Sequence, residues 1–232
     1  MLLELKNIQK TFADRAGGQV RAVDGVSLSV TAGESCALVG ESGCGKTTLA
    51  RIVMGLVRPD AGEMLFEGQP VWGDRQRERY FRRMARMVFQ DPFASLDPRY
   101  TVRSILEEAL HLEPKCSAEA CSSKMKSVLT AVGLSGEILS RYPHEFSGGE
   151  RQRIAIGRAL MTGPKLLVLD EAVSSLDVII QKEVLDCLVA LQKDRGLTYI
   201  FITHNIKAAH RIAHKIAVMR SGKIVEWGTI GA

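Results

Sequence analysis

The chain has 232 residues, 46% of them hydrophobic and 25% charged, with a net charge of +5. This balance predicts one large globular domain, and the modest charge argues against a nucleic-acid partner. No apolar run reaches the roughly 18 residues of a membrane-spanning helix, and the acidic start Met1–Lys6 does not predict a signal peptide. The five cysteines lack metal-ligand spacing, so we expect free thiols of a reducing cytosol.

The first predicted elements are strands over residues 2–8 and 20–30, where leucines and valines alternate with polar residues. That alternation predicts an antiparallel sheet with one exposed face. Phe12 lies between the two strands, just before a Gly17-Gly18 turn. From this stretch alone, its ring can stack on an adenine base or pack against the sheet.

A glycine-rich loop follows the apolar run 36–39 and precedes a predicted helix over 49–54. A strand, this loop and a helix have the spacing of a phosphate-binding loop, whereas a plain glycine turn requires neither flanking element. We expect Lys46 to reach the β- and γ-phosphates of a nucleoside triphosphate, and the Thr47 hydroxyl to ligate Mg²⁺. The predicted nucleotide-binding residues of the loop are Gly40, Ser42, Gly43, Cys44, Gly45, Lys46, Thr47 and Thr48.

The middle of the chain changes from strands to helices. Strands are expected over 63–66 and 86–89, and the mixed charges of the intervening segment 75–86 indicate a solvated helical face. Prolines then interrupt the pattern, and helices are predicted over 101–111 and 117–132. We therefore predict a helical subdomain, residues 92 to about 155, inserted into an α/β core.

Ser147, Gly148, Gly149 and Glu150 begin another predicted helix that extends to Leu160. A serine and two glycines at a helix start are typical of an ordinary N-cap and equally of a second anion site. The residues of this stretch leave both interpretations open.

Two late apolar runs end in residues that suit phosphate chemistry. The run 166–169 predicts a buried parallel strand followed by Asp170 and Glu171. We expect Asp170 to hold Mg²⁺, and Glu171 to orient or deprotonate the attacking water. A further strand, 198–203, ends at His204, for which we expect a γ-phosphate contact.

The order of these parts resembles that of the ATP-binding subunits of ABC transporters, and the resemblance covers essentially the whole chain. The motifs that carry it are the phosphate loop 40–48, Gln90, the signature Ser147-Gly148-Gly149, strand 166–170, Glu171, the loop Ser175-Leu176-Asp177, and His204. It implies an α/β P-loop NTPase core of the RecA type with an N-terminal antiparallel β subdomain. It also implies ATP and Mg²⁺ as ligands, with Phe12 stacking on adenine.

In such a subunit Lys46, Glu171, His204 and Gln90 would be the catalytic residues, and Gln90 would also contact Mg²⁺. The resemblance further implies that Asp177 contributes to nucleotide binding, and that Ser147–Glu150 serve a nucleotide held by a second ATP-binding subunit, identical or different. Two membrane permease subunits and, indirectly, a solute-binding protein would complete the assembly. The chain would then lie peripherally on the cytoplasmic face of the inner membrane.

Residues 88–99 and 171–177 resemble the oligopeptide, dipeptide and nickel importer branch. Longer peptide-importing members carry a C-terminal cysteine cluster that this sequence lacks, so it resembles the short nickel or metal-chelate subunits more. The main hypothesis is an ATPase subunit for import of a nickel- or peptide-like solute. The alternatives are a soluble ABC-type ATPase acting on nucleic acid or the ribosome, and a P-loop kinase or GTPase, which does not explain the signature.

The sequence departs from the family pattern in three motifs. Phe146 and Glu150 replace the leucine and glutamine that usually flank Ser-Gly-Gly, Asn205 replaces an aspartate, and Ala172-Val173 replace Pro-Thr. We expect the Glu150 carboxylate to weaken the signature by repelling phosphate, unless its side chain turns away.

Overall fold

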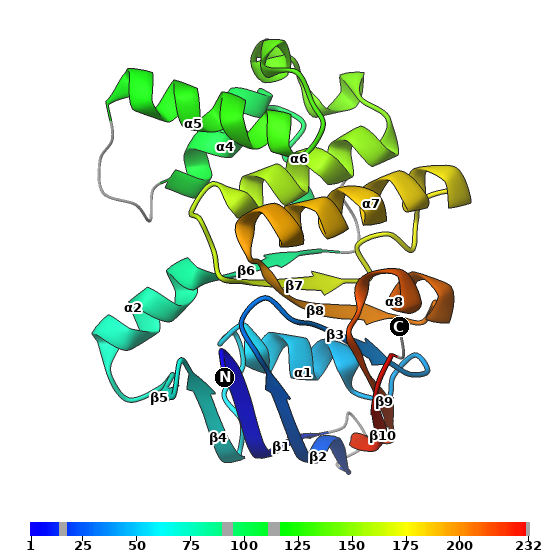
Figure 1. Ribbon diagram of the computed structural model, residues 1–232. Helices are drawn as coiled ribbons and strands as arrows, with labels where there is room; N and C mark the ends of the chain where they lie inside the picture. Colours follow the sequence, from blue (N-terminus) through cyan, green and yellow to red (C-terminus); the bar gives the residue numbers. More distant parts are fainter. Residues whose placement is uncertain (14–17, 90–94, 111–116, 231–232) are drawn as a thin grey trace.

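The computed structural model describes residues 1–13, 18–89, 95–110 and 117–230, which form two sheets with helices between and beside them (Figure 1). The smaller sheet is antiparallel, in the order β2-β1-β4-β5. Its strands are β1 (Leu3–Ala13), β2 (Gln19–Val30), β4 (Ala61–Phe66) and β5 (Gln69–Pro70). The predicted antiparallel sheet is therefore confirmed, although β1 is longer than expected and includes Phe12.

The larger sheet has the order β10-β9-β3-β8-β7-β6. Its strands are β3 (Ser35–Val39), β6 (Ala85–Val88), β7 (Leu166–Asp170), β8 (Thr198–Thr203), β9 (Lys215–Arg220) and β10 (Lys223–Thr229). All described neighbours in it pair in parallel except β9 and β10. The carboxyl ends of β3, β7 and β8 therefore meet at one edge, where α/β sheets place their ligand contacts.

The buried strand β7 supplies side chains to two hydrophobic cores. Leu166 and Val168 pack with the antiparallel sheet and with α1 (Lys46–Val53), while Leu167 and Leu169 pack with the helices on the opposite face. Burying each leucine contributes roughly 1.5–3 kcal/mol. These two cores fix the end of β7, and with it Asp170, relative to α1.

The helices fall into two groups (Figure 1). Helix α1 lies between the sheets, and the other face of the larger sheet is covered by a helical layer. Helix α2 (Arg75–Met84) shares the core of α1 through Phe81 and Met84. The helical layer consists of α4 (Val102–Ala109), α5 (Ala118–Ala131), the 3₁₀ turns η2 (Gly136–Ser140) and η3 (Pro143–Glu145), α6 (Gly148–Leu160), α7 (Val178–Arg195) and α8 (Ile206–Ile212). The expected helices after Pro98 are confirmed, whereas α8 was not predicted.

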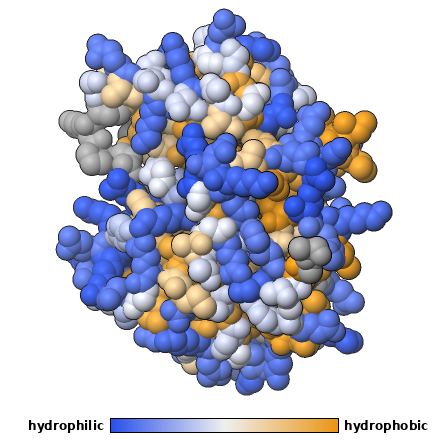
Figure 2. Space-filling view, in the orientation of Figure 1, coloured by the Kyte–Doolittle hydropathy of each residue, from blue (hydrophilic) through white to orange (hydrophobic). Residues whose placement is uncertain are grey.

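Across the described ranges, no helix combines the length and apolar character that crossing a membrane requires. Figure 2 shows a mostly hydrophilic face with an apolar patch at the N-terminal end of α7, where Val178 is 82% and Ile179 is 73% exposed. Cys36, Cys44 and Cys187 are free, as predicted, but Cys121 is disulfide-bonded. The prediction of free thiols is wrong there, because spacing in the sequence does not reveal which thiols meet in space.

Candidate nucleotide-binding site

The loop between β3 and α1 is clamped by backbone from two distant strands. A Cβ atom at Gly40 would lie 2.2 Å from the carbonyl oxygen of Met219, and one at Gly45 would lie 2.1 Å from that of Ala22. Gly45 also has a φ of 110°, which side chains rarely permit. Glycine is therefore required at both positions, and β2 and β9 together hold the loop in shape.

The N-terminus of α1 carries no internal anion. Its N-cap is Gly45, no side chain caps it, and its first turn contains no acidic residue. The first N–H groups of a helix have no partner within the helix, and together with the helix dipole they attract anions. A phosphate group fits this helix start.

The Lys46 ammonium is held across the same loop. This buried side chain donates hydrogen bonds to the carbonyl oxygens of Gly40 (2.7 Å) and Glu41 (2.8 Å), and its Nζ lies 3.8 Å from the Cys44 sulfur. The loop thus fixes a positive charge at its own mouth, before any phosphate binds.

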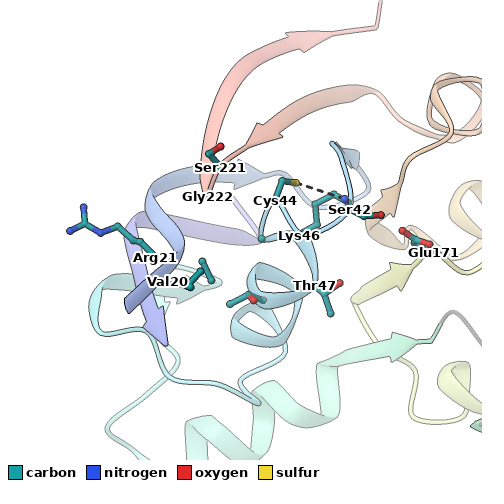
Figure 3. Close-up of a pocket in the computed structure, with 13 residues that line it drawn as sticks. Val20, Arg21, Ser42, Cys44, Lys46, Thr47, Glu171, Ser221 and Gly222 are labelled. Atoms are coloured by element: carbon teal, nitrogen blue, oxygen red, sulfur yellow. Dashed lines mark hydrogen bonds between the residues drawn. The ribbon is translucent and has the colours of Figure 1, made fainter. Parts of the chain in front are cut away.

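A cavity of about 420 Å³ opens over the loop, within the size range of small-ligand sites. Besides residues 42–48, its lining comes from Val20–Ala22, Glu171, Ser221 and Gly222. Figure 3 shows Glu171 on one side of the loop, with Val20 and Arg21 on the other. The cavity is therefore elongated from the β1–β2 hairpin to the end of β7.

Asp170 and Glu171 follow β7 but differ in environment. Asp170 is buried, and the burial raises the pKa of its carboxyl, as does the neighbouring charge of Glu171, while Arg51 and Lys46 oppose the rise. A nearby cation therefore stabilises the ionised form of Asp170. In the described part of the chain, no three His, Cys, Asp or Glu side chains form a metal-binding group.

Glu171 occupies a left-handed conformation, with φ at 48°, that is uncommon for a non-glycine residue. Its N–H donates to the Ile202 carbonyl (2.9 Å), and its carbonyl accepts from the Ser174 N–H and hydroxyl (3.0 and 2.8 Å). The Nδ1 atom of His204 lies 3.5 Å from the Glu171 carboxylate, and the imidazole is exposed. Strained backbone held in this way is typical of functional sites.

Ser147–Glu150 lie outside the lining of this cavity. Ser147 caps α6, because its hydroxyl accepts from the Glu150 N–H (3.3 Å) and donates to the Glu150 carboxylate (2.8 Å), which also accepts from the Ser147 N–H (2.8 Å). The hydrogen bond from that N–H is the main reason why the pKa of Glu150 lies below its usual value. The side chain of Glu150 thus folds back onto the signature itself.

The signature helix packs against the start of α7. A Cβ atom at Gly149 would lie 2.3 Å from Cγ2 of Ile180, and one at Gly148 would lie 3.4 Å from Leu176. Asp177 caps α7 by accepting from the Ile179 and Ile180 N–H groups (3.1 and 3.0 Å). Asp177 is therefore grouped with the signature and not with the cavity.

Phe12 and Gln90 complete the predicted set. Phe12 is 42% exposed, its ring centroid lies 5.5 Å from the Lys10 ammonium, and its cross-strand partner is Val20 in the cavity lining. The ring is thus available at the edge of the cavity without lining it. Gln90 lies outside the described residues.

With this geometry established, comparisons identify the family. The sequence model of the ABC transporter family matches residues 23–174. The chain belongs to the ABC transporter family. It is 43% identical to the oligopeptide transport ATP-binding protein AppF of Bacillus subtilis, over 97% of this chain and 71% of the relative. It is 45% identical to OppF of Streptococcus mutans, over 98% of this chain and 75% of the relative.

Solved structures agree with this ABC assignment and with the predicted P-loop NTPase fold. CbiO1 of Clostridium perfringens, part of the ABC transporter complex cbiONQ, superposes with a TM-score of 0.88 at 27% identity, over 99% of this chain and 88% of that one. The cassette MJ0796, a dimer in a post-hydrolysis state bound to ADP and Pi, gives 0.86 at 25% identity, over 99% of both chains. As an ABC ATPase, this chain binds ATP.

Two departures of this ABC chain from the family pattern have structural explanations. Asn205 caps α8 by accepting from the Lys207 and Ala208 N–H groups (3.0 and 3.2 Å), a role in which asparagine equals aspartate. Phe146 is buried, with its ring centroid 4.6 Å from the Arg141 guanidinium. Nothing in the structure explains why Ala172-Val173 stand at their positions.

Sequence reasoning missed two parts of the ABC cavity. Val20–Ala22 arrive on β2, and Ser221-Gly222 form the β9–β10 turn, whose Gly222 N–H donates to the Cys44 carbonyl (2.9 Å). Both lie far in sequence from the residues they meet, and no local motif marks them. Gly222 has the positive φ of a tight turn, but its contact with the loop depends on the strand order.

Proposed function

We propose that this chain is the ATP-hydrolysing subunit of an ABC importer. The observation that carries the proposal is the uncapped N-terminus of α1, with Lys46 fixed above it and Glu171 at the far side of one cavity. Such a site binds a nucleoside triphosphate by its phosphates and leaves a carboxylate beside the γ-phosphate. A nucleic-acid function has no comparable observation in its favour.

In this proposal the residues of the phosphate loop bind ATP in defined ways. The N–H groups from Gly43 to Thr48 surround the β-phosphate, and the Lys46 ammonium exchanges its carbonyl partners for phosphate oxygens. Thr47 and Asp170, with Gln90, would hold Mg²⁺, which neutralises charge that develops on the phosphates. Phe12 would stack on adenine at the hairpin end of the cavity.

Hydrolysis depends on the residues after β7 and β8. Glu171 would orient and deprotonate the attacking water, because its carboxylate faces the cavity from the side opposite Val20 and Arg21. His204, beside that carboxylate, would donate a hydrogen bond to the γ-phosphate. The strained backbone of Glu171 keeps the carboxylate in this position.

The proposed partner is a second ATP-binding subunit, identical or different, whose nucleotide meets Ser147–Glu150 of this chain. Exposed Val178 and Ile179 next to Asp177 support pairing at this face, since an exposed apolar patch marks an interaction site. The dimeric relative MJ0796 supports it as well. Two membrane permease subunits and a solute-binding protein would complete a transporter in which this chain lies on the cytoplasmic face.

We propose a peptide-type solute. The relatives AppF and OppF are named for oligopeptide transport, and a dipeptide transport protein, DppF of Haemophilus influenzae, is 44% identical over 91% of this chain and 65% of its own length. A nickel or metal-chelate solute stays a prediction from sequence. The helical subdomain over 92–155 is proposed as the part that transmits the state of the nucleotide to the permeases.

The test compares nucleotide binding with hydrolysis in two variants. E171Q should keep ATP binding and lose hydrolysis by roughly 10²–10⁴-fold, because only the catalysed proton transfer is removed. K46A should weaken nucleotide binding by about 10–100-fold, because a charged hydrogen-bond donor is lost. K193A, at the exposed end of α7, is the matched control. Turnover by E171Q within a few-fold of the original protein would contradict the role of Glu171.

A further inference from the structure

The hydrogen-bond donors of Ser147 at the start of α6 are paired with a carboxylate of the same helix, that of Glu150. The Ser147 N–H and hydroxyl both donate to the same oxygen of Glu150, each at 2.8 Å, and the Glu150 N–H donates back to the Ser147 hydroxyl at 3.3 Å. This reciprocal arrangement is a capping box, for which the pattern is Ser-x-x-Glu or Ser-x-x-Gln.

The capping box uses the donor that an incoming phosphate would need. A serine hydroxyl has one hydrogen to donate, and here it is directed at Glu150. The carboxylate also places a full negative charge at the anion-attracting end of α6. An anion that approaches Ser147 from outside therefore meets repulsion and an occupied donor.

A glutamine at this position would have nearly the same shape as Glu150, with no charge and with an NH₂ donor in place of one carboxylate oxygen. Its side-chain oxygen can accept from the Ser147 N–H, so the capping box and the start of α6 would be retained. Its neutral amide would neither repel a phosphate nor hold the serine hydroxyl by a charge-assisted bond. The exchange of Glu for Gln thus separates stabilisation of the helix from occupation of the anion site.

Two arginines lie in the surroundings of Glu150. Arg141 and Arg153 both interact with it electrostatically. Arg153 also pairs with Glu183 of α7 at 3.4 Å, and Arg141 with Glu145 at 3.3 Å. Their positive charges would offset part of the electrostatic cost of moving the Glu150 carboxylate away from Ser147.

We propose that Glu150 is a positioning residue whose carboxylate occupies the hydrogen-bond donors of Ser147. The γ-phosphate of a partner subunit's ATP must displace this carboxylate before two subunits close. This inference rests on the proposed function and concerns the regulation of that site. The expected consequence is that this chain closes on nucleotide only at a higher ATP concentration than the same chain with glutamine at position 150.

The test measures ATP-driven pairing in the E171Q background, where slow hydrolysis keeps ATP bound. Light scattering follows dimer formation against ATP concentration for the chain with Glu150 and for E150Q. The E150Q change should lower the half-saturating ATP concentration by about fivefold or more, the scale of a coupling between two sites. If the partner subunit is a different chain, the two residues at position 150 are compared in the assembled transporter without E171Q. The quantity measured there is the ATP dependence of hydrolysis.

E145Q is the matched control. Glu145 makes the same kind of bond to a backbone N–H, that of Tyr142 at 2.6 Å, but it caps η3 and not the signature helix. E145Q should leave the ATP dependence of pairing unchanged. Thermal unfolding of E150Q close to that of the parent protein verifies that the cap is retained.

Three results decide the matter. A lower ATP requirement in E150Q but not in E145Q supports the proposal. An equal or higher ATP requirement in E150Q overturns it, while pairing itself remains and the proposed function stands. Absence of ATP-driven closure with either residue at position 150, in both assays, contradicts the proposed function and this inference together.

Discussion

Two helices of this protein begin at glycine-rich loops, and they differ in how the backbone N–H groups of their first turn are satisfied. Helix α1 starts at Gly45 with no side-chain cap and no acidic residue in its first turn, whereas α6 starts at Ser147 with a complete capping box from Glu150. The unpaired N–H groups of a helix start attract anions in both cases. One start is left open for a ligand, and the other is satisfied from within the chain.

The glycines differ accordingly. At Gly45 a side chain would strike the Ala22 backbone, which belongs to the scaffold of the cavity, whereas at Gly149 it would strike the side chain of Ile180 on a neighbouring helix. Similar glycine patterns thus have different causes. In α1 the glycine shapes the anion site, and in α6 it permits close packing of two helices.

The largest expected effect is that of G45A. The new Cβ would lie 2.1 Å from a backbone oxygen at a φ of 110°, so the loop must move. We expect a loss of more than about 3 kcal/mol in the free energy of unfolding and no measurable nucleotide binding. Thermal unfolding and a nucleotide titration measure both quantities.

G33A is the control for G45A, because Gly33 also has a positive φ but no atom within 4 Å of a new Cβ. It carries only the conformational penalty, about 1–2 kcal/mol, and should bind nucleotide normally. Equal stability losses in G33A and G45A would show that the contact with Ala22 does not shape the loop.

G149A tests the second helix start and should have a smaller effect, a loss of about 2 kcal/mol in the free energy of unfolding, because a side chain can yield where backbone cannot. The Cβ would meet Cγ2 of Ile180 at 2.3 Å. I180A in the same chain should recover part of the loss, giving a coupling energy of about 0.5–3 kcal/mol in a double-mutant cycle.

Denaturant unfolding of the two single variants and the double variant gives that coupling energy, and G148A, with ordinary contact at 3.4 Å, is the tolerated control. Nucleotide binding by the isolated subunit should stay unchanged in G149A. If the double variant loses as much unfolding free energy as the two single variants together, Gly149 is required for some reason other than its packing on Ile180.

These pairs also show how far the sequence predicts the molecule. The phosphate loop, Asp170, Glu171 and His204 are local patterns at strand ends, so the sequence alone locates them. The cavity also needs Val20–Ala22 and Gly222, which meet the loop only because β2 and the β9–β10 turn fold onto it. Contacts between distant strands leave no local signal.

Glu150 and Asn205 show a different kind of error. Both depart from a family pattern, and the repulsion expected of the Glu150 carboxylate does not by itself predict where its side chain lies. Ser147-x-x-Glu150 is a capping pattern that can be read from the sequence, and Asn205 before a helix is another. Local capping chemistry could have predicted where both side chains lie, whereas the packing of Gly149 on Ile180 depends on the positions of two helices.

A smaller effect is expected from E150A, which removes the carboxylate half of the capping box. The Ser147 N–H and hydroxyl lose their acceptor, whereas the N–H of residue 150 still donates to the Ser147 hydroxyl, and we expect a loss of about 1 kcal/mol in the free energy of unfolding. In a protein of this size that corresponds to a fall of roughly 2–4 °C in Tm. E150Q should lose less than half as much, and equal losses would show that charge, and not capping, stabilises this turn.

The smallest effect is the pH dependence of that cap. The hydrogen bonds from Ser147, aided by Arg153 and Arg141, hold the pKa of Glu150 below its usual value of 4.5. The unfolded chain therefore binds a proton at a higher pH than the folded chain does, so the stabilisation is complete above the unfolded pKa and is lost as pH falls through the folded pKa. The difference in unfolding free energy between the original protein and E150A should thus shrink as the pH is lowered from 7 to below 4.5. Glu145 and the other carboxylates titrate in both proteins, so their contributions cancel in this difference. A difference that stays constant with pH would mean that the stability of the α6 start does not depend on the charge of Glu150. The contrast with the open start of α1 would then be one of hydrogen bonding alone.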